Sequence, residues 1–293
     1  MKLFHSNVDS VDQADFVVVG VPDESRSHAK RRGASKGPDS LRIASNSFEF
    51  FEREGKIIPI CPMKGTLENK RIFDFGNISR QDLYKLIFDI VSANKLPITI
   101  GGDHSITSVI LQAIYKVSKV DKITLLYFDA HPDFVSSTRN FYGSVITDSF
   151  NYIDFTKSTL IGTRAAEPEE LENASKQKLE IITPIDIIES GINSVVKKII
   201  SKCGTSKVYL SIDLDCMDPG VAPGVSVPAP GGLFPLDLIY IIKRISENSQ
   251  VVGMDIVELC PDYDLNQNTA NQASRILMEA ISSMEISPVR VTN

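Results

Sequence analysis

The sequence lacks the features typical of membrane, secreted and nucleic-acid-binding proteins. It contains no uninterrupted run of about 18 apolar residues, the length expected of a membrane span. Its first ten residues, MKLFHSNVDS, have no apolar core of the kind found in secretory signals. Basic residues are not in excess, because 31 Lys and Arg stand against 37 Asp and Glu, whereas nucleic-acid-binding domains usually carry a basic excess. We therefore expect a protein that binds neither nucleic acid nor a membrane.

Cysteine is also scarce, and its spacing excludes two further classes. The four cysteines are scattered and contain no C-x-x-C pair; they are Cys61, Cys203, Cys216 and Cys260. This spacing argues against a disulfide framework and against a zinc ribbon. We expect reduced thiols and a cytoplasmic protein.

What remains is an ordinary globular composition with an α/β pattern. A chain of 293 residues can bury a large core without disulfides or metals to hold it together. No internal repeat or low-complexity linker divides it, so we expect a single domain over residues 1–293. Short β-branched runs alternate with helical stretches, and most of these runs are continuously apolar, which is typical of strands buried on both faces of a parallel sheet. The pattern predicts one doubly wound α/β domain.

The expected elements can be placed by these patterns. Strands are expected at residues 16–21, 97–101, 123–128, 158–162, 208–213 and 251–257. Helices are expected at residues 79–93, which begins with a capping serine, and at 236–246 and 270–283. Residues 25–38 and 218–235 are expected to be long loops, a feature that is usually functional in a compact domain.

Three segments combine an apolar strand with metal-ligand residue types at its carboxyl end. They are ITIGGDHS (98–105), YFDAHPDF (127–134) and SIDLDCMDP (211–219). Open α/β sheets bind ligands in the crevice outside the carboxyl ends of their strands. Two of the chain's four histidines, His104 and His131, fall inside these segments. Chance placement is a poor explanation for this coincidence.

The acidic residues of these segments predict a binuclear metal site. Asp129, His131 and Asp133 alternate along the chain, so an extended backbone would project them to one side, and Asp213 and Asp215 would share a face for the same reason. Carboxylates crowded together repel unless a cation lies between them. Four carboxylates balance two divalent ions, and oxygen with imidazole but without thiolate suits Mn²⁺. Two such ions can activate one water for hydrolysis.

With these three segments the sequence resembles the ureohydrolases, the family of arginase and agmatinase. GGDHS, DAHPD and SIDLDCMDP resemble its three signature motifs in the family's order. The likeness extends to GVPDES, GASKGPDSLRIAS, APGVSVPAPGGL and DIVELCPDYD, and FDFGNI resembles a short Asp-Gly-Asp stretch with Asn77 in the last place. The resemblance therefore covers nearly the whole chain.

The resemblance implies a fold, a cofactor and a reaction. The fold would be a three-layer α/β/α sandwich around a mainly parallel eight-stranded sheet. The cofactor would be two Mn²⁺ ions per subunit, and the ligands would be His104, Asp129, His131, Asp133, Asp213 and Asp215. A bridging hydroxide would attack a guanidinium carbon and release urea and an amine. Glu258 would grip the guanidinium, and Asp133 would also accept a proton. Assembly as a homo-oligomer, a trimer or a hexamer, is implied by the resemblance alone.

The substrate is suggested by one position after DAHPD. Arginases hold the α-carboxylate of arginine with an Asn two residues beyond the last Asp of this motif, where this chain has Val135. Agmatine, which lacks that carboxylate, is therefore the favoured substrate, and putrescine would be the product, as in polyamine biosynthesis. Arginine, guanidinobutyrate and formimidoylglutamate stay open, since Arg31, Arg32 or Arg139 would be able to meet a carboxylate.

One residue departs from the family pattern. The family usually has Asn-x-His-Gly after DAHPD, with a histidine that shuttles protons, and this chain has Asn140-Phe141-Tyr142-Gly143. A phenol with a pKa near 10 shuttles protons less well at neutral pH than an imidazole with a pKa near 6.5. We expect lower activity, an alkaline optimum or another substrate, and a metal-binding relative without activity is the alternative.

Overall fold

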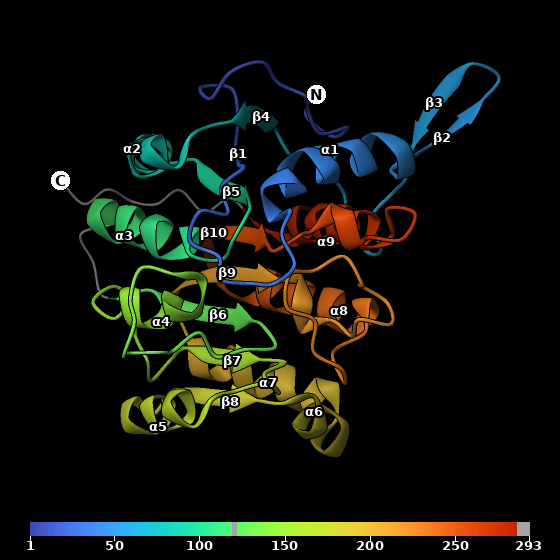
Figure 1. Ribbon diagram of the computed structural model, residues 1–293. Helices are drawn as coiled ribbons and strands as arrows, with labels where there is room; N and C mark the ends of the chain where they lie inside the picture. Colours follow the sequence, from blue (N-terminus) through green and yellow to red (C-terminus); the bar gives the residue numbers. More distant parts are fainter. Residues whose placement is uncertain (119–121, 286–293) are drawn as a thin grey trace.

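The computed structural model describes residues 1–118 and 122–285. One eight-stranded sheet forms its centre, in the spatial order β4-β1-β5-β10-β9-β6-β7-β8, and each neighbouring pair is parallel (Figure 1). The strands are β1 (Phe16–Val21), β4 (Ile72–Asn77), β5 (Leu96–Gly101), β6 (Thr124–Phe128), β7 (Thr159–Ile161), β8 (Glu180–Ile182), β9 (Lys207–Asp213) and β10 (Gln250–Val257).

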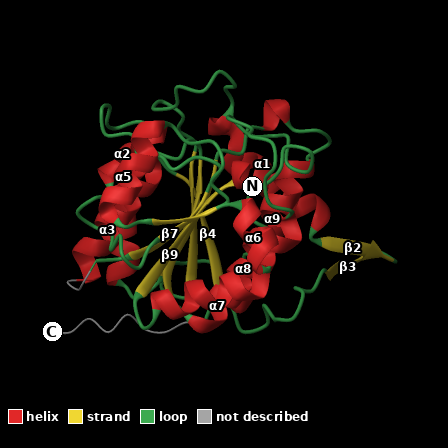
Figure 2. Cartoon of the chain, turned by 90° about the horizontal axis from the view of Figure 1, so that it is seen from below, coloured by secondary structure: helices red, strands yellow, loops and turns green. Residues whose placement is uncertain are grey.

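Helices cover both faces of this sheet (Figure 2). The longer ones on one face are α2 (Arg80–Ser92), α3 (Ile106–Ser118) and α5 (Pro168–Gln177). The other face carries α1 (Gly37–Phe48), α6 (Pro184–Ser190), α7 (Ile192–Cys203), α8 (Pro235–Asn248) and α9 (Asn268–Ser283). The short α4 (Val145–Asp148) and the 3₁₀ turns η1 (Ala34–Lys36), η2 (Tyr142–Ser144), η3 (Leu214–Cys216) and η4 (Pro261–Tyr263) lie in the connections. The predicted three-layer α/β/α sandwich is confirmed. No helix of the described part of the chain is long and apolar enough to cross a membrane.

The apolar runs of the sequence form strands whose two faces are both covered by helices. All residues of β1 and β6 are buried, as expected of central strands in a parallel sheet. The six predicted strands are each found to within one residue at either end. Two others gave no clear signal: β4 is an edge strand with exposed Phe75, and β8 has only three residues.

Two details of the predicted connections differ. Ser79 does occupy the N-cap position of α2, but its hydroxyl donates to the Asp82 carboxylate at 2.7 Å and makes no bond to the helix backbone. The loop expected at 25–38 ends earlier, because η1 and the start of α1 occupy its second half. Pro38 lies in the first turn of α1, where its missing N–H has no intrahelical partner to lose.

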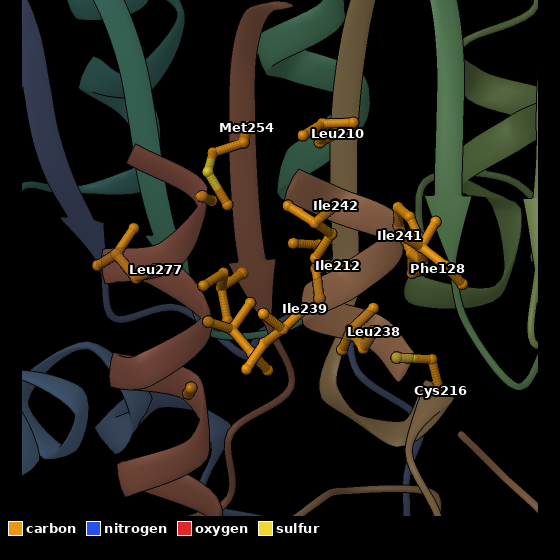
Figure 3. Packing of buried hydrophobic residues seen from close by; sticks show 14 of the residues in the cluster. Phe128, Leu210, Ile212, Cys216, Leu238, Ile239, Ile241, Ile242, Met254 and Leu277 are labelled. Carbon is orange, nitrogen blue, oxygen red and sulfur yellow. The ribbon is translucent and has the colours of Figure 1, made fainter. Parts of the chain in front are cut away.

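The packing of α8 on the sheet holds the carboxyl ends of the central strands in place. Leu238, Ile241 and Ile242 recur at helical spacing and are buried against β9 and β6, next to Ile212 and Phe128 (Figure 3). Each such side chain contributes roughly 1.5–3 kcal/mol when it leaves water. The strand ends that follow these contacts are therefore firmly positioned.

A hairpin of β2 (Phe50–Arg53) and β3 (Lys56–Pro59) projects from the body of the molecule (Figures 1 and 2). Its Phe51 and Ile57 side chains are exposed. Sequence patterning did not predict this hairpin, because its strands are short and all of their residues except the half-buried Phe50 are exposed.

Candidate metal centre

The three signature segments converge because their strands are neighbours in the sheet. The order β5-β10-β9-β6 places four parallel strands side by side, so their carboxyl ends share one edge. The residues that follow them include His104 after β5, Asp129 after β6, Asp213 at the end of β9 and Glu258 after β10. This edge is the crevice where open α/β sheets bind ligands.

Two groups of side chains at this edge have the composition and spacing of metal sites. In the first, the Nδ1 atom of His104 lies 3.0 Å from the Asp129 carboxylate and 3.3 Å from that of Asp213. In the second, the Nδ1 atom of His131 lies 3.3 Å from Asp129 and 3.2 Å from Asp215. Each group could hold one ion, and Asp129 belongs to both. A shared carboxylate is the arrangement that two neighbouring ions need.

Asp133 lies beside the first group without belonging to it. Its Oδ2 atom is 3.5 Å from His104 Nδ1 and accepts a hydrogen bond of 2.5 Å from the Tyr127 hydroxyl. The Tyr127 ring stacks on the His104 imidazole, with centroids 4.5 Å apart. Asp133 is therefore held at the site by a tyrosine from the preceding strand.

The backbone route by which these ligands converge differs from the prediction. An extended segment was expected from Asp129 to Asp133, but Asp133 has a left-handed φ of 49°. Asp215 lies in the 3₁₀ turn η3, where its N–H donates to Asp213 at 2.8 Å. Tight turns, not alternation along an extended chain, bring the carboxylates together.

The electrostatics of the site fit a bound cation. Burial raises the pKa values of Asp213 and Asp215, and neighbouring carboxylates raise them further. Burial alone would lower the pKa of the His131 imidazole, but Asp215 and Asp129 raise it to about 12. In the bare protein, protons must therefore balance the buried carboxylates. A divalent ion would balance them instead, and the oxygen and imidazole donors present are suited to one.

Glu258 adds a buried carboxylate with one free oxygen. Its side chain is only 2% exposed, so it is not a surface acid. One oxygen accepts the backbone N–H of His104 at 2.8 Å, and the other has no hydrogen-bond partner among the described residues. Burial raises the pKa of this carboxyl group to about 7, although the nearby Ser226 hydroxyl and the His104 N–H lower it. An unpaired buried carboxylate oxygen is costly, and a cationic donor would satisfy it.

Tyr142 is brought to the same site by the segment that follows. It is half-buried, and its backbone N–H donates to the carbonyl of Arg26. This bond connects it to the basic loop, residues 25–33, which carries Arg26, Lys30, Arg31 and Arg32. Burial raises the pKa of its phenol, and the nearby Asp133 and Glu258 carboxylates raise it further. The exposed His28 stacks on Phe141, next to Tyr142. The basic loop therefore lies at the site.

Three polar residues near the site were missed by sequence reasoning: Tyr127, Ser211 and Asp255. All are buried within strands, and each makes hydrogen bonds to other buried polar groups. The signal available was a polar residue inside an otherwise apolar run, as in VYLSID and VVGMDIV. Such residues need buried partners, and these partners are part of the site.

Comparisons with known proteins agree with this geometry. The sequence model of the Arginase family matches residues 14–282. An agmatinase of Neisseria meningitidis is 31% identical over 283 residues, which cover 92% of this chain and 86% of that protein. The agmatine ureohydrolase of Thermoplasma volcanium has a TM-score of 0.81 and 30% identity, with 97% of this chain and 94% of that chain covered. Proclavaminate amidino hydrolase of Streptomyces clavuligerus has a TM-score of 0.84 and 25% identity, with 97% and 96% covered. The resemblance to ureohydrolases is thus confirmed, and the chain belongs to the arginase family.

Proposed function

We propose that this protein hydrolyses agmatine to putrescine and urea. Two kinds of finding support the proposal: relatives named as agmatinases over most of the chain, and a site with the required chemistry. The single observation that carries it is the free, buried oxygen of Glu258 beside two His/Asp groups. This combination provides a carboxylate that can bind a guanidinium group next to a binding site for two metal ions.

We propose that two Mn²⁺ ions bind at this edge of the sheet. His104, Asp129 and Asp213 would hold one, and Asp129, His131 and Asp215 the other, with Asp133 as a further ligand. When bound, such ions lower the pKa of water and so supply a nucleophile near neutral pH.

The residues of the chain supply binding, orientation and proton transfer. The Glu258 carboxylate would accept N–H groups of the guanidinium and hold its carbon at the site, because a planar cation is fixed best by charge-assisted hydrogen bonds. The Asp133 carboxylate would accept a proton as water adds to that carbon. This proton would then leave with the amine, and the C–N bond to the amine would break to give urea and putrescine. The Tyr142 hydroxyl would donate a hydrogen bond to the groups that exchange this proton.

The structure disfavours substrates that carry a carboxylate. Val135 offers an apolar side chain, and its backbone N–H donates to the Gly143 carbonyl. Arg32 donates to the Ser27 carbonyl at 2.6 Å, and Arg31 donates to the Pro223 carbonyl and lies over the Tyr263 ring. Two of the three candidate arginines are thus engaged, which favours agmatine over arginine, guanidinobutyrate and formimidoylglutamate. The exposed Arg139 is the one left to meet a carboxylate.

Three broader features are proposed on the family resemblance. They are a single ureohydrolase domain over residues 1–293, a cytoplasmic location and assembly as a homotrimer or hexamer. A role in polyamine biosynthesis would follow from putrescine as product.

The direct experiment measures urea release from agmatine by the Mn²⁺-loaded protein between pH 7 and pH 10. Arginine and guanidinobutyrate serve as competing substrates in parallel assays. Turnover of agmatine with a kcat/KM well above the other two is expected. Faster turnover of a guanidino acid would overturn the assignment of agmatine, and full metal binding without turnover of any of them would favour a non-catalytic relative.

A further inference from the structure

A buried chain of polar side chains runs from the metal-facing His104 into the sheet. The Nε2 atom of His104 lies 2.8 Å from the Ser211 hydroxyl, which donates to Oδ1 of Asp255 at 2.7 Å. Ser211 and Asp255 face each other as paired residues of β9 and β10. All three side chains are at most 1% exposed, so water does not substitute for any of these contacts.

The carboxylate of Asp255 is fixed by two more donors. The Thr107 hydroxyl donates to Oδ2 at 2.7 Å, and the Tyr209 hydroxyl donates to the same atom at 2.8 Å. Among the described residues, the other oxygen, Oδ1, accepts a hydrogen bond from Ser211, whose hydroxyl also lies 3.4 Å from that of Thr107. Since both oxygens accept hydrogen bonds, the orientation of this carboxylate is determined by its surroundings.

The proton count along this chain determines the role of the Nε2 atom of His104. A serine hydroxyl has one proton, and here that proton points to Asp255. The 2.8 Å contact between Ser211 and His104 must then be a bond donated by Nε2–H. The other nitrogen, Nδ1, lies 3.0 Å from Asp129, 3.3 Å from Asp213 and 2.9 Å from the Tyr127 hydroxyl, whose own proton goes to Asp133. Without a metal, Nδ1 therefore carries a proton, and that proton occupies the place that a metal ion would take while the Nε2–H bond to Ser211 stays in place.

We propose that Asp255 and Ser211 are positioning residues that hold His104 in its Nε2–H tautomer and thereby make Nδ1 a metal ligand. The inference rests on the metal site proposed above, but it does not depend on which substrate the protein hydrolyses. Hydrogen bonds behind a metal-bound histidine typically change metal affinity by about 10–100-fold. The effect should fall on the ion held by His104 and not on the ion held by His131.

An Asp255→Asn variant should reverse the direction of the hydrogen bond between Ser211 and His104. The Asn carbonyl would take the place of Oδ2, where Thr107 and Tyr209 donate, so its amide would face Ser211. Ser211 would then have to donate to Nε2, which moves the ring proton to Nδ1 and blocks the metal-binding atom. Although this change is nearly isosteric, it should weaken metal binding at least as much as Ser211→Ala does.

The test is a Mn²⁺ titration without substrate, following free Mn²⁺ by electron paramagnetic resonance. Native protein, Asp255→Asn, Ser211→Ala and the control Tyr209→Phe are compared, together with their melting temperatures. We expect Asp255→Asn and Ser211→Ala to weaken one of two Mn²⁺ sites by about 10–100-fold. Tyr209→Phe removes a donor to Asp255 without touching Ser211 or His104, so its Mn²⁺ affinity should stay close to native even where its melting temperature falls.

Three outcomes would overturn the proposal: unchanged Mn²⁺ affinity in both variants, equal weakening of both Mn²⁺ sites, or an equal loss in Tyr209→Phe. If the variants do not fold, long-range ¹H–¹⁵N correlation of ¹⁵N-histidine in the native protein decides, with diamagnetic Zn²⁺ in place of Mn²⁺. A proton on Nε2 of His104 supports the proposal, and a proton on Nδ1 contradicts it. Failure to hydrolyse agmatine would affect neither measurement.

Discussion

The backbone N–H of His104 donates to the carboxylate of Glu258 across 2.8 Å, so the carboxylate proposed to bind the guanidinium and a proposed metal ligand share a hydrogen bond. Glu258 itself has a left-handed φ of 63°, and its N–H donates to the Gly102 carbonyl. Both ends of Glu258 are therefore fixed to the loop that carries His104. The guanidinium carbon would be placed relative to the metals by this loop.

Replacing Glu258 with Gln tests whether its carboxylate binds the guanidinium group of the substrate. Glutamine keeps an oxygen that accepts the His104 N–H, but it loses the charge that would bind a guanidinium. A hydrogen bond to a charged group contributes about 1.5–3 kcal/mol, so kcat/KM for agmatine should fall by roughly 10–150-fold. Steady-state kinetics measure this. An unchanged kcat/KM would remove Glu258 from the site.

Asp133→Asn tests the proton acceptor. The amide can still meet the Tyr127 hydroxyl through its oxygen, so the fold should persist. General base catalysis is typically worth about 10²–10⁴-fold, and kcat should drop by at least this much. Circular dichroism and melting temperature serve as the controls for folding. Full activity in this variant would refute the role of Asp133.

Tyr142 tests the departure from the family pattern. Burial and the Asp133 and Glu258 carboxylates raise the pKa of its phenol above the usual value near 10, so the hydroxyl stays protonated throughout neutral pH. An imidazole has an unperturbed pKa near 6.5 and can exchange protons at neutral pH. Tyr142→His should therefore raise kcat at pH 7 relative to pH 9. If the pH–rate profile does not move, Tyr142 does not lie on the proton path.

Local residue types explain what could be predicted of this site, and strand register explains what could not. His104, Asp129 and Asp213 end apolar runs, so sequence alone places them at one edge of the sheet. The link between Ser211 and Asp255 depends on the pairing of β9 with β10, whose register follows from packing across the whole sheet. No local pattern in the sequence encodes that register.

The stability of the outer strand β4 depends on a buried ion pair. Arg42 is bonded to Asp74 through Nε and Nη2, both at 2.8 Å, and neither side chain is more than 1% exposed. Burial raises the pKa of Asp74, but the bonds from Arg42 outweigh this effect and lower it. The pair therefore stabilises the fold above the unfolded pKa near 3.9 and is lost as the pH falls through the lower folded value.

Asp74→Ala should lower the free energy of unfolding by about 3–5 kcal/mol, because it leaves the buried Arg42 guanidinium without its buried carboxylate partner. The matched control is Asp39→Ala, which removes the exposed carboxylate 3.7 Å from the same guanidinium. Exposed pairs contribute about 0–1 kcal/mol, so this variant should remain close to native. Urea denaturation measures both. Equal effects of the two substitutions would contradict the importance of the buried pair.

Metal binding should release protons and should tighten as the pH rises. In the bare protein the pKa of His131 is raised to about 12, because Asp215 and Asp129 outweigh the opposing effect of burial, so its imidazole is protonated at pH 8. A metal ion needs a neutral imidazole and must displace that proton. Calorimetric titration with Mn²⁺ in buffers of different ionisation enthalpy counts the protons released. His28→Ala is the control, since this exposed histidine lies outside both metal groups and its loss should leave the count unchanged. A Mn²⁺ affinity that stays constant between pH 6 and pH 9 would contradict the proposed ligand role of His131, because no proton would then be exchanged for the metal.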